Sequence, residues 1–272
     1  MHGDRSVEGF AWQVGIWDKL STVYEDEVDT RFTPVIHHLM ARADLKPGQA
    51  VLDLGTGTGS VAFEAAAAVG PDGTVTGVDI SPEMLAVARA RASARSLNGI
   101  DFVEGRGEAI PAPDRSQDAV LASLSLMYVI DRAAAAAEVA RVLRPGGRFV
   151  AAVWSGPDTN DIVKFQQTAG RFAPEPPVDG VGPGALADPS SFLLQLGSAG
   201  LDARVDVEVT TFVFPNFEAA WDVLAGVTTA SLDPERQAEA KAALRALMWP
   251  AADDPLEFRN DTQYIVAVRP HD

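Results

Sequence analysis

Three glycines, Gly55, Gly57 and Gly59, alternate with other residues directly after the apolar run 50–54 and before the alanine-rich run 60–69. Glycine loses more conformational entropy on folding than any other residue, so three in one turn indicate a requirement of the backbone. A glycine-rich turn between a strand and a helix lets the main chain approach a ligand at the helix N-terminus. The stretch therefore predicts a ligand-binding turn, and the alternative is a tight turn without a ligand.

An aspartate, Asp79, stands twenty residues beyond Gly59, at the end of the next apolar run. A carboxylate at this place can accept two hydrogen bonds from the vicinal hydroxyls of a ribose. The dinucleotide pattern G-x-G-x-x-G would need its third glycine at position 60, which is Ser60. The two features together predict a ribose-containing ligand, with a spacing that departs from the nicotinamide dinucleotide type.

The elements that must position these residues follow a βαβ pattern from about residue 50 to 155. Short apolar or β-branched runs alternate with longer helical ones, which is typical of a parallel sheet with helices on its faces. We expect Ser81 and Asp131 to be helix N-caps, with Pro82 at the first helical position. The expected strands are 50–54, 74–80, 100–105, 118–125 and 148–154, and the expected helices are 60–69, 82–95 and 132–143.

After Trp154 the pattern changes. Residues 173–190 are too rich in proline and glycine for a regular element and predict a long loop. Helices expected at 217–227 and 233–248 lie between two expected strands, which makes them an insertion before the last strand. The other expected elements are a short helix at 190–200, capped by Ser190 or Ser191, and strands at 203–214 and 262–269.

Four ordered motifs carry a resemblance to a known family: "VLDLGTGTG", "VTGVDISPEMLAVARAR", "DFVEGRGEAIPAPDRSQDAV" and "EVARVLRPGGRFV". Over roughly residues 31–154 the sequence resembles the class I S-adenosylmethionine-dependent methyltransferases, in particular their quinone-biosynthesis-like (methyltransferase type 11) branch. The resemblance implies an α/β fold with a Rossmann-like, doubly wound, mostly parallel seven-stranded sheet, an N-terminal helical segment and a helical insertion before the last strand. We expect a methyltransferase domain at 31–272, residues 1–30 as a helical lid, and loop 156–190 with insertion 215–258 as a substrate cap.

The same resemblance implies a binding site for S-adenosylmethionine, with S-adenosylhomocysteine as the product. The glycine turn would hold the methionine moiety, Asp79 the ribose, and the segments after the second to fourth strands the adenine and the floor of the site. Arg106 stands where the family usually has an aspartate that accepts from the adenine amino group, whereas arginine can only donate, and its role stays open. The implied cofactor-binding residues are Asp53, Gly55, Thr56, Gly57, Gly59, Asp79, Ile80, Met84, Gly107, Glu108, Ser123 and Leu124.

The implied activity is transfer of a methyl group to carbon or oxygen of a small, largely apolar metabolite. Tyr24 and Tyr128 are the candidate catalytic residues, and Trp17 would share a helix face with Tyr24. Whether a general base is used stays open. His37 and His38 are adjacent on an expected helix and cannot both face one site. We expect no metal, since no suitable carboxylate cluster follows the fourth strand.

We expect the acceptor pocket to be built from the N-terminal helix, the 156–188 loop and the 215–258 insertion. Its expected aromatic residues are Trp154, Phe165, Phe172, Phe192, Phe214, Phe217, Trp221 and Trp249.

The amino-acid composition excludes some classes of binding partner. The net charge of −16 opposes binding to a nucleic-acid backbone, which requires clustered lysine and arginine. The chain has no cysteine, so disulfides and thiolate sites are excluded. Without a signal-like start or a long apolar run, we expect no membrane span and a cytoplasmic monomer or homo-oligomer that acts on a small molecule. The alternatives are a nicotinamide-dependent oxidoreductase, and a cyclase or binding protein that keeps the cofactor site.

Overall fold

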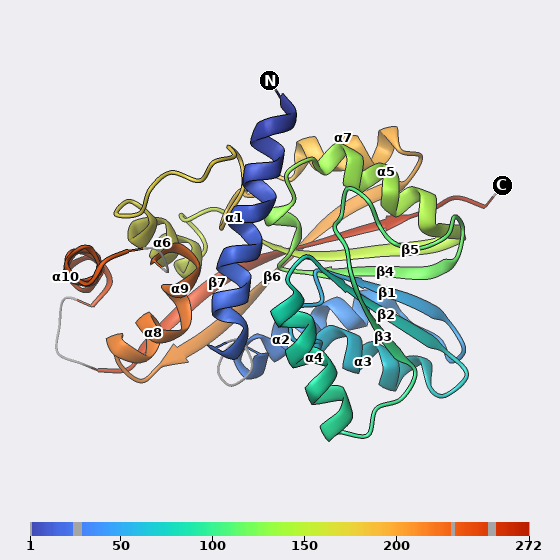
Figure 1. Ribbon diagram of the computed structural model, residues 1–272, viewed down its shortest axis with the longest axis horizontal. Helices are drawn as coiled ribbons and strands as arrows, with labels where there is room; N and C mark the ends of the chain where they lie inside the picture. Colours follow the sequence, from blue (N-terminus) through green and yellow to red (C-terminus); the bar gives the residue numbers. More distant parts are fainter. Residues whose placement is uncertain (1, 24–28, 230–231, 250–253, 272) are drawn as a thin grey trace.

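The computed structural model describes residues 2–23, 29–229, 232–249 and 254–271, and a mixed β-sheet runs through the middle of this part of the chain (Figure 1). Its strand order is β3-β2-β1-β4-β5-β7-β6. Neighbours among β1 to β5 are parallel, whereas β7 is antiparallel to both β5 and β6. The seven strands of the described chain are β1 (Ala50–Leu54), β2 (Thr74–Asp79), β3 (Ile100–Glu104), β4 (Gln117–Ser123), β5 (Leu143–Trp154), β6 (Asp202–Phe214) and β7 (Leu256–Val268). The expected α/β fold with a mostly parallel seven-stranded sheet is confirmed.

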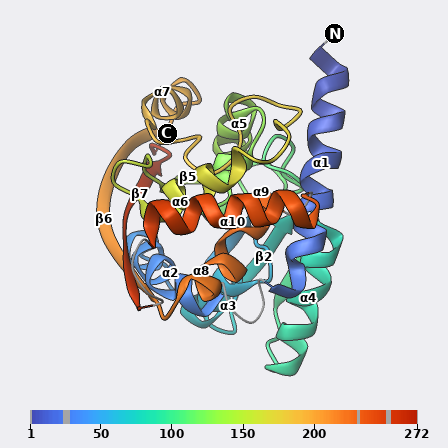
Figure 2. The ribbon, with the colours of Figure 1, turned by 90° about the vertical axis from the view of Figure 1, so that its left-hand side faces the viewer.

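Helices cover both faces of the sheet, and each face has its own apolar core. Helices α2, α3 and α4 pack on one face, and α5 and α7 pack on the other (Figure 1). Figure 2 shows α6, α8, α9 and α10 together at the end of the molecule that faces the viewer, with α1 beside them. The helices are α1 (His2–Val23), α2 (Asp29–Ala43), α3 (Ser60–Val69), α4 (Pro82–Ala94), α5 (Arg132–Val142), α6 (Asp161–Gly170), α7 (Ser190–Ser198), α8 (Phe217–Leu224), α9 (Gly226–Thr229) and α10 (Pro234–Met248), with a 3₁₀ turn at Leu126–Tyr128.

Side-chain caps fix where the helices beside the parallel strands begin. The Ser81 hydroxyl accepts the Met84 N–H at the start of α4, and the Asp131 carboxylate accepts the Ala134 N–H at the start of α5. Each cap satisfies an N–H that has no partner inside the helix. Both expected caps are confirmed, and α4 begins directly beyond the strand end that carries Asp79.

Two strands begin earlier than expected. β5 starts at Leu143 instead of 148, because the Gly146 N–H donates to the Arg269 carbonyl and the Arg269 N–H donates to the Gly147 carbonyl. β7 starts at Leu256 instead of 262, because β6 offers a partner to every residue of that extension. Both segments therefore join the sheet because adjacent backbone of the same protein pairs with them.

Two expectations for the segment after β5 are wrong. Part of 156–190 is the helix α6, which Asn160 caps by accepting the Val163 N–H and which buries Ile162, Val163 and Phe165. Helix α7 has Pro189 as its N-cap and no side-chain cap, while the Asp188 carboxylate accepts the Ser190 N–H. The cap expected at Ser190 or Ser191 is therefore replaced by a bond from the preceding loop.

Among the described residues, no helix is both long enough and apolar enough to cross a bilayer.

Candidate functional site

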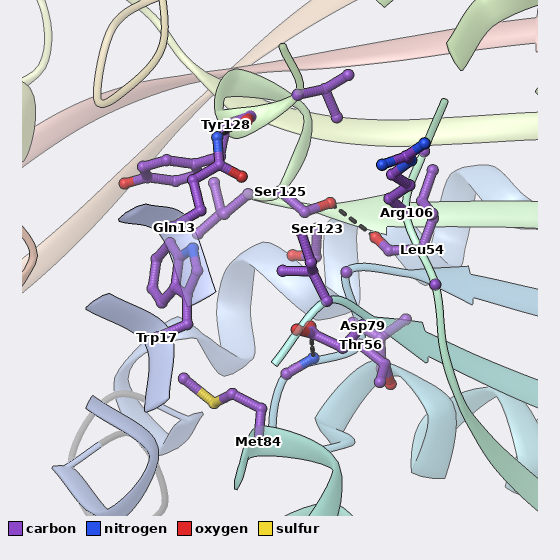
Figure 3. A pocket seen from close by; sticks show the side chains of 18 of the residues that line it. Gln13, Trp17, Leu54, Thr56, Asp79, Met84, Arg106, Ser123, Ser125 and Tyr128 are labelled. Atoms are coloured by element: carbon purple, nitrogen blue, oxygen red, sulfur yellow. Dashed lines mark hydrogen bonds between the residues drawn. The ribbon is translucent and has the colours of Figure 1, made fainter. Parts of the chain in front are cut away.

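A cavity opens where strands β1, β2 and β4 end, and α1 passes over it (Figure 3). The glycine turn and the segments after β2, β3 and β4 form its walls, and α1 and α2 add apolar side chains. Its described lining residues are Phe10, Gln13, Trp17, Phe32, Ile36, Leu54, Gly55, Thr56, Gly57, Thr58, Ser60, Val61, Asp79, Ile80, Met84, Gly105, Arg106, Gly107, Glu108, Ser123, Leu124, Ser125, Tyr128 and Val129. The carboxyl ends of parallel strands at the point where the strand order reverses are a common ligand-binding place in such sheets.

The glycine turn needs glycine for two different reasons. Gly55 has φ +71°, and a Cβ there would lie 2.3 Å from the Ser125 Cβ, so the turn touches the segment after β4. Gly57 has φ +53°, but a Cβ there would meet nothing within 4 Å. The backbone beside Gly57 is therefore open to a ligand, while Gly55 brings two walls of the cavity together.

Gly59 lies behind the residues that line the cavity. It is the N-cap of α3 with φ +93°, and a Cβ there would lie 2.8 Å from the Phe63 ring. It does not line the cavity. Its contribution is to let the first turn of α3 pack close to the glycine turn.

Asp79 lies in the wall and organises the backbone around it (Figure 3). One carboxylate oxygen accepts the Gly57 N–H at 2.8 Å and the other accepts the Ser81 N–H at 2.9 Å. Burial raises the pKa of Asp79, which these N–H donors partly counteract and to which the negative charge of Asp18 adds. A single buried carboxylate thus joins the glycine turn to the start of α4.

Asp53, like Gly59, is an expected binding residue that does not line the cavity. Its side chain is fully buried, and one of its oxygens accepts a hydrogen bond from the Thr56 hydroxyl at 2.6 Å. Burial raises the pKa of Asp53 to about 7, with the negative charge of Asp79 adding to the shift. Thr56 lines the cavity and Asp53 does not, so Asp53 supports the turn from behind.

The remaining residues expected after β2, β3 and β4 do line the cavity: Ile80, Met84, Gly107, Glu108, Ser123 and Leu124. The Glu108 carboxylate accepts the N–H groups of Ile130 and Asp131, which ties the segment after β3 to the start of α5. Leu124 has φ +56°, a conformation that costs a leucine energy and that is found at ligand sites more often than elsewhere.

Helix α1 supplies wall residues that the sequence analysis missed. Phe10 and Gln13 line the cavity together with the expected Trp17. The Gln13 side-chain amide donates to the Tyr128 carbonyl at 2.6 Å, and the Trp17 and Tyr128 rings meet edge to face at 4.9 Å between centroids. Positions 10, 13 and 17 share one helix face, which is the signal that could have identified them.

Of the two candidate catalytic tyrosines, the structure describes only Tyr128. Tyr128 lines the cavity beside Trp17, as Figure 3 shows. Tyr24 lies outside the described residues. Arg106, whose role was open, also lines the cavity, and its guanidinium stacks over the Phe10 ring at 4.5 Å.

The aromatic residues expected in the acceptor pocket lie away from this cavity. Of the eight aromatic residues named for it, none is among the described residues that line the cavity. Most of them pack together instead; the Phe165 and Phe217 rings, for example, lie 6.3 Å apart. Phe192 packs on the opposite face of the sheet, against Phe149. An apolar pattern marks these positions as buried but does not say which cavity, if any, they face.

The two adjacent histidines also lie away from the cavity. His37 is exposed, and the His38 ring is 6.0 Å from the Tyr264 ring. The expectation that they do not share a site is confirmed. Within the described ranges, no three histidine, aspartate or glutamate side chains converge in a way that could hold a metal ion.

Comparisons with known proteins find similarity over part of the chain. The model of a methyltransferase domain matches residues 52–151. Nocamycin O-methyltransferase of Saccharothrix syringae is 40% identical over 134 residues, which are 49% of this chain and 48% of that protein. A ubiquinone/menaquinone biosynthesis C-methyltransferase, UbiE, of Methylobacterium nodulans is 46% identical over 108 residues, 40% of this chain and 43% of that protein. The matched region thus spans about half the length of each relative.

The fold has solved counterparts. The crystal structure of YcgJ from Bacillus subtilis aligns with a TM-score of 0.64 at 20% identity, covering 87% of this chain and 98% of that one. At this identity the likeness concerns the fold, and it extends beyond the matched domain. The matches thus identify residues 52–151 as a methyltransferase domain, and the motifs and the position of the cavity agree with the class I S-adenosylmethionine-dependent type.

Proposed function

We propose that the protein transfers a methyl group from S-adenosylmethionine to carbon or oxygen of a small, largely apolar metabolite and releases S-adenosylhomocysteine. The observation that carries this proposal is a single cavity in which the glycine turn, Asp79 and the Gly107–Glu108 segment meet beneath α1. The nucleoside-binding signals and an apolar chamber therefore belong to one site.

The residues present fit the donor. Asp79 places a carboxylate in the wall, which suits the ribose hydroxyls. The backbone at Gly57 has open space beside it, which suits the close approach of the methionine moiety. Ile80 and Met84 give the wall an apolar patch for the adenine ring. These assignments support the proposal and follow the order of the family motifs along the chain.

The acceptor would occupy the part of the cavity bordered by Trp17, Tyr128, Phe32 and Ile36. Phe32 and Ile36 come from α2, Trp17 from α1 and Tyr128 from the turn after β4, and no described residue of the 215–258 insertion lines the cavity. The insertion supports α1 instead, because a Cβ on Gly226 would lie 2.6 Å from Leu20. We therefore propose that residues 1–30 act as a lid and that the insertion holds this lid in place.

The chain's contribution to catalysis would be alignment and exclusion of water. When bound, the donor supplies a methyl group on a positively charged sulfur, and transfer is an in-line displacement that depends strongly on orientation. Trp17 and Gln13 bring α1 onto Tyr128 and so close the chamber. The Tyr128 hydroxyl would orient the acceptor by a hydrogen bond. Transfer to oxygen and transfer to carbon are both represented among the names of similar proteins.

A melting experiment tests the donor. S-adenosylhomocysteine at a hundred times its Kd should stabilise the fold by about 2.7 kcal/mol, whereas NAD at the same concentration should leave the melting temperature unchanged. Stabilisation by NAD alone would contradict the proposal and favour an oxidoreductase.

A transfer experiment tests the reaction. The protein is incubated with methyl-labelled S-adenosylmethionine and a panel of small phenols, enols and quinols, and the label is followed into the acceptor. Donor binding without transfer to any acceptor would favour the cyclase or binding-protein alternative. The Tyr128→Phe variant should bind the donor as well as the wild type and should lower kcat/KM for an acceptor that transfers label.

A further inference from the structure

Arg106 stands in the cavity wall at a place where the backbone has little freedom. It is flanked by Gly105 and Gly107, and a Cβ on Gly105 would lie 2.8 Å from Pro111. The Arg106 carbonyl accepts the Ala109 N–H at 3.1 Å, which forms a short bridge. The wall at this point is therefore fixed, and the side chain of Arg106 is what reaches beyond it.

The side chain reaches α1. The Arg106 guanidinium lies 4.5 Å from the centre of the Phe10 ring, and both residues line the cavity. Figure 3 shows Arg106 across the cavity from Trp17 and Tyr128. A cation over an aromatic face is attracted by the ring's quadrupole. The contact thus links the segment after β3 with the N-terminal half of α1.

Other contacts attach α1 to the segments after the neighbouring strands. Gln13 donates to the Tyr128 carbonyl after β4, and the Ser81 hydroxyl after β2 donates to the Asp18 carboxylate at 2.6 Å. With the Phe10–Arg106 pair, α1 is attached to the segments after β2, β3 and β4, three of the four segments that the proposed donor would touch. The position of α1 over the cavity therefore depends on loops that would also bind the donor.

We propose that Arg106 is a positioning residue that couples seating of α1 to donor binding through Phe10. An arginine at this place has no acceptor for the adenine amino group, so its contribution is to hold the lid against the adenine side of the cavity. Because coupling between two events is reciprocal, a seated α1 and a bound donor must favour each other by the same factor. The donor part of this inference rests on the proposed function, whereas the attachment of α1 by Arg106 does not.

Hydrogen exchange of the ligand-free protein tests the attachment. Arg106→Met keeps the length of the side chain and removes the cation, so amides of residues 7–17 should exchange about threefold to thirtyfold faster, the range expected for a cation–π contact. Amides of the sheet should be unchanged, and Arg106→Lys should restore most of the protection. Arg204→Met, a matched change on the exposed edge strand β6, should have no effect on α1. Equal exchange of α1 in wild type and Arg106→Met would overturn the inference, as would faster exchange throughout the sheet.

Calorimetric titration with S-adenosylhomocysteine tests the coupling. Arg106→Met should raise the Kd by at most the factor seen in α1 exchange, Phe10→Leu should raise it equally, and the double variant should be no weaker than either single one. Additive losses in the double variant would overturn the inference, because independent residues add. If the wild type binds no S-adenosylhomocysteine, the proposed function fails, and the exchange experiment still decides whether Arg106 holds α1.

Discussion

At the scale of single residues, Gly55 and Gly57 both have a backbone conformation that strains other residues, but only Gly55 lies against a neighbouring side chain. Both have positive φ, so an alanine at either position carries a similar conformational cost of about 1 kcal/mol. The Ser125 side chain stands where a Cβ on Gly55 would project, whereas the space beside Gly57 is open. Two neighbouring glycines of one motif therefore have separable roles, one in folding and one in binding.

The first prediction follows from this contrast. Gly57→Ala should lower the free energy of unfolding by about 1 kcal/mol and greatly weaken binding of S-adenosylhomocysteine, because the methyl group enters space that the donor would use. Gly55→Ala should destabilise the protein more, since its Cβ collides with Ser125. Urea unfolding and calorimetric titration of both variants check the two halves. Equal stabilities for the two variants would contradict the assignment.

The second prediction concerns Asp79. Asp79→Ala should weaken binding of S-adenosylhomocysteine at least tenfold, because hydrogen bonds to a charged group are worth about 1.5 to 3 kcal/mol. It should also destabilise the fold, since the N–H groups of Gly57 and Ser81 lose their acceptor. Asp79→Asn keeps the shape and one of the two acceptor oxygens, so it should destabilise the fold less than Asp79→Ala while removing the charge. Asp72→Ala, at an exposed position in a turn, is the control, and unchanged affinity in both Asp79 variants would exclude the ribose contact.

At the scale of elements, one serine links α1 to the start of α4. The Ser81 hydroxyl caps α4 by accepting the Met84 N–H and donates to Asp18 of α1. The start of a core helix and the seat of the lid thus share a single side chain. Variants at its two ends can separate these roles.

The third prediction uses this pair. Ser81→Ala should lower the free energy of unfolding by about 1 kcal/mol, the usual cost of losing an N-cap, and should also loosen α1. Asp18→Asn keeps the cap, so it should loosen α1 with a smaller loss of global stability. Hydrogen exchange of α1 and urea unfolding give the two readouts. A larger global loss for Asp18→Asn than for Ser81→Ala would show that the cap is not what stabilises α4.

The elements also show what sequence could and could not predict. The buried parallel strands were predictable because their apolar runs are bounded by clear turn and cap signals, as at Ser81 and Asp131. Helix α6 was missed because the proline- and glycine-rich stretch after it dominated the segment, although Asn160 followed by Ile162, Val163 and Phe165 carries a helical pattern.

For the site, the local part was predictable and the long-range part was not. The glycine turn and Asp79 are read from spacing within one βαβ unit. The contact between Gln13 and Tyr128 joins residues 115 positions apart, and nothing in either local pattern specifies that partner. The aromatic residues of the insertion failed for the same reason, because hydrophobicity predicts burial without naming the surface that is covered.

At the scale of the whole molecule, the sheet places two buried carboxylates under the donor cavity. Asp53 near the end of β1 and Asp79 at the end of β2 lie on adjacent parallel strands, and the charge of Asp79 disfavours ionisation of Asp53. Such an arrangement makes global stability depend on pH. It also gives the site negative potential where the proposed donor carries a positive sulfur, so a cost to folding coincides with a gain in binding.

The fourth prediction is the pH dependence that Asp53 imposes. Its pKa is raised from 3.8 to about 7, so the folded state binds this proton more tightly than the unfolded chain does. The stability that Asp53 contributes is therefore complete below about pH 4 and is lost as the pH rises through about 7, with an upper bound of about 4 kcal/mol. Asp53→Asn, which cannot ionise, should gain stability relative to wild type between pH 4 and pH 8, as measured by urea unfolding at each pH. Thr56→Val removes the hydroxyl that donates to Asp53, so its destabilisation should be larger at pH 8 than at pH 4. Parallel stability curves for wild type and Asp53→Asn would mean that the pKa of Asp53 is the same in the folded and the unfolded protein, so that Asp53 is ionised through this range and the pH dependence argued here is absent.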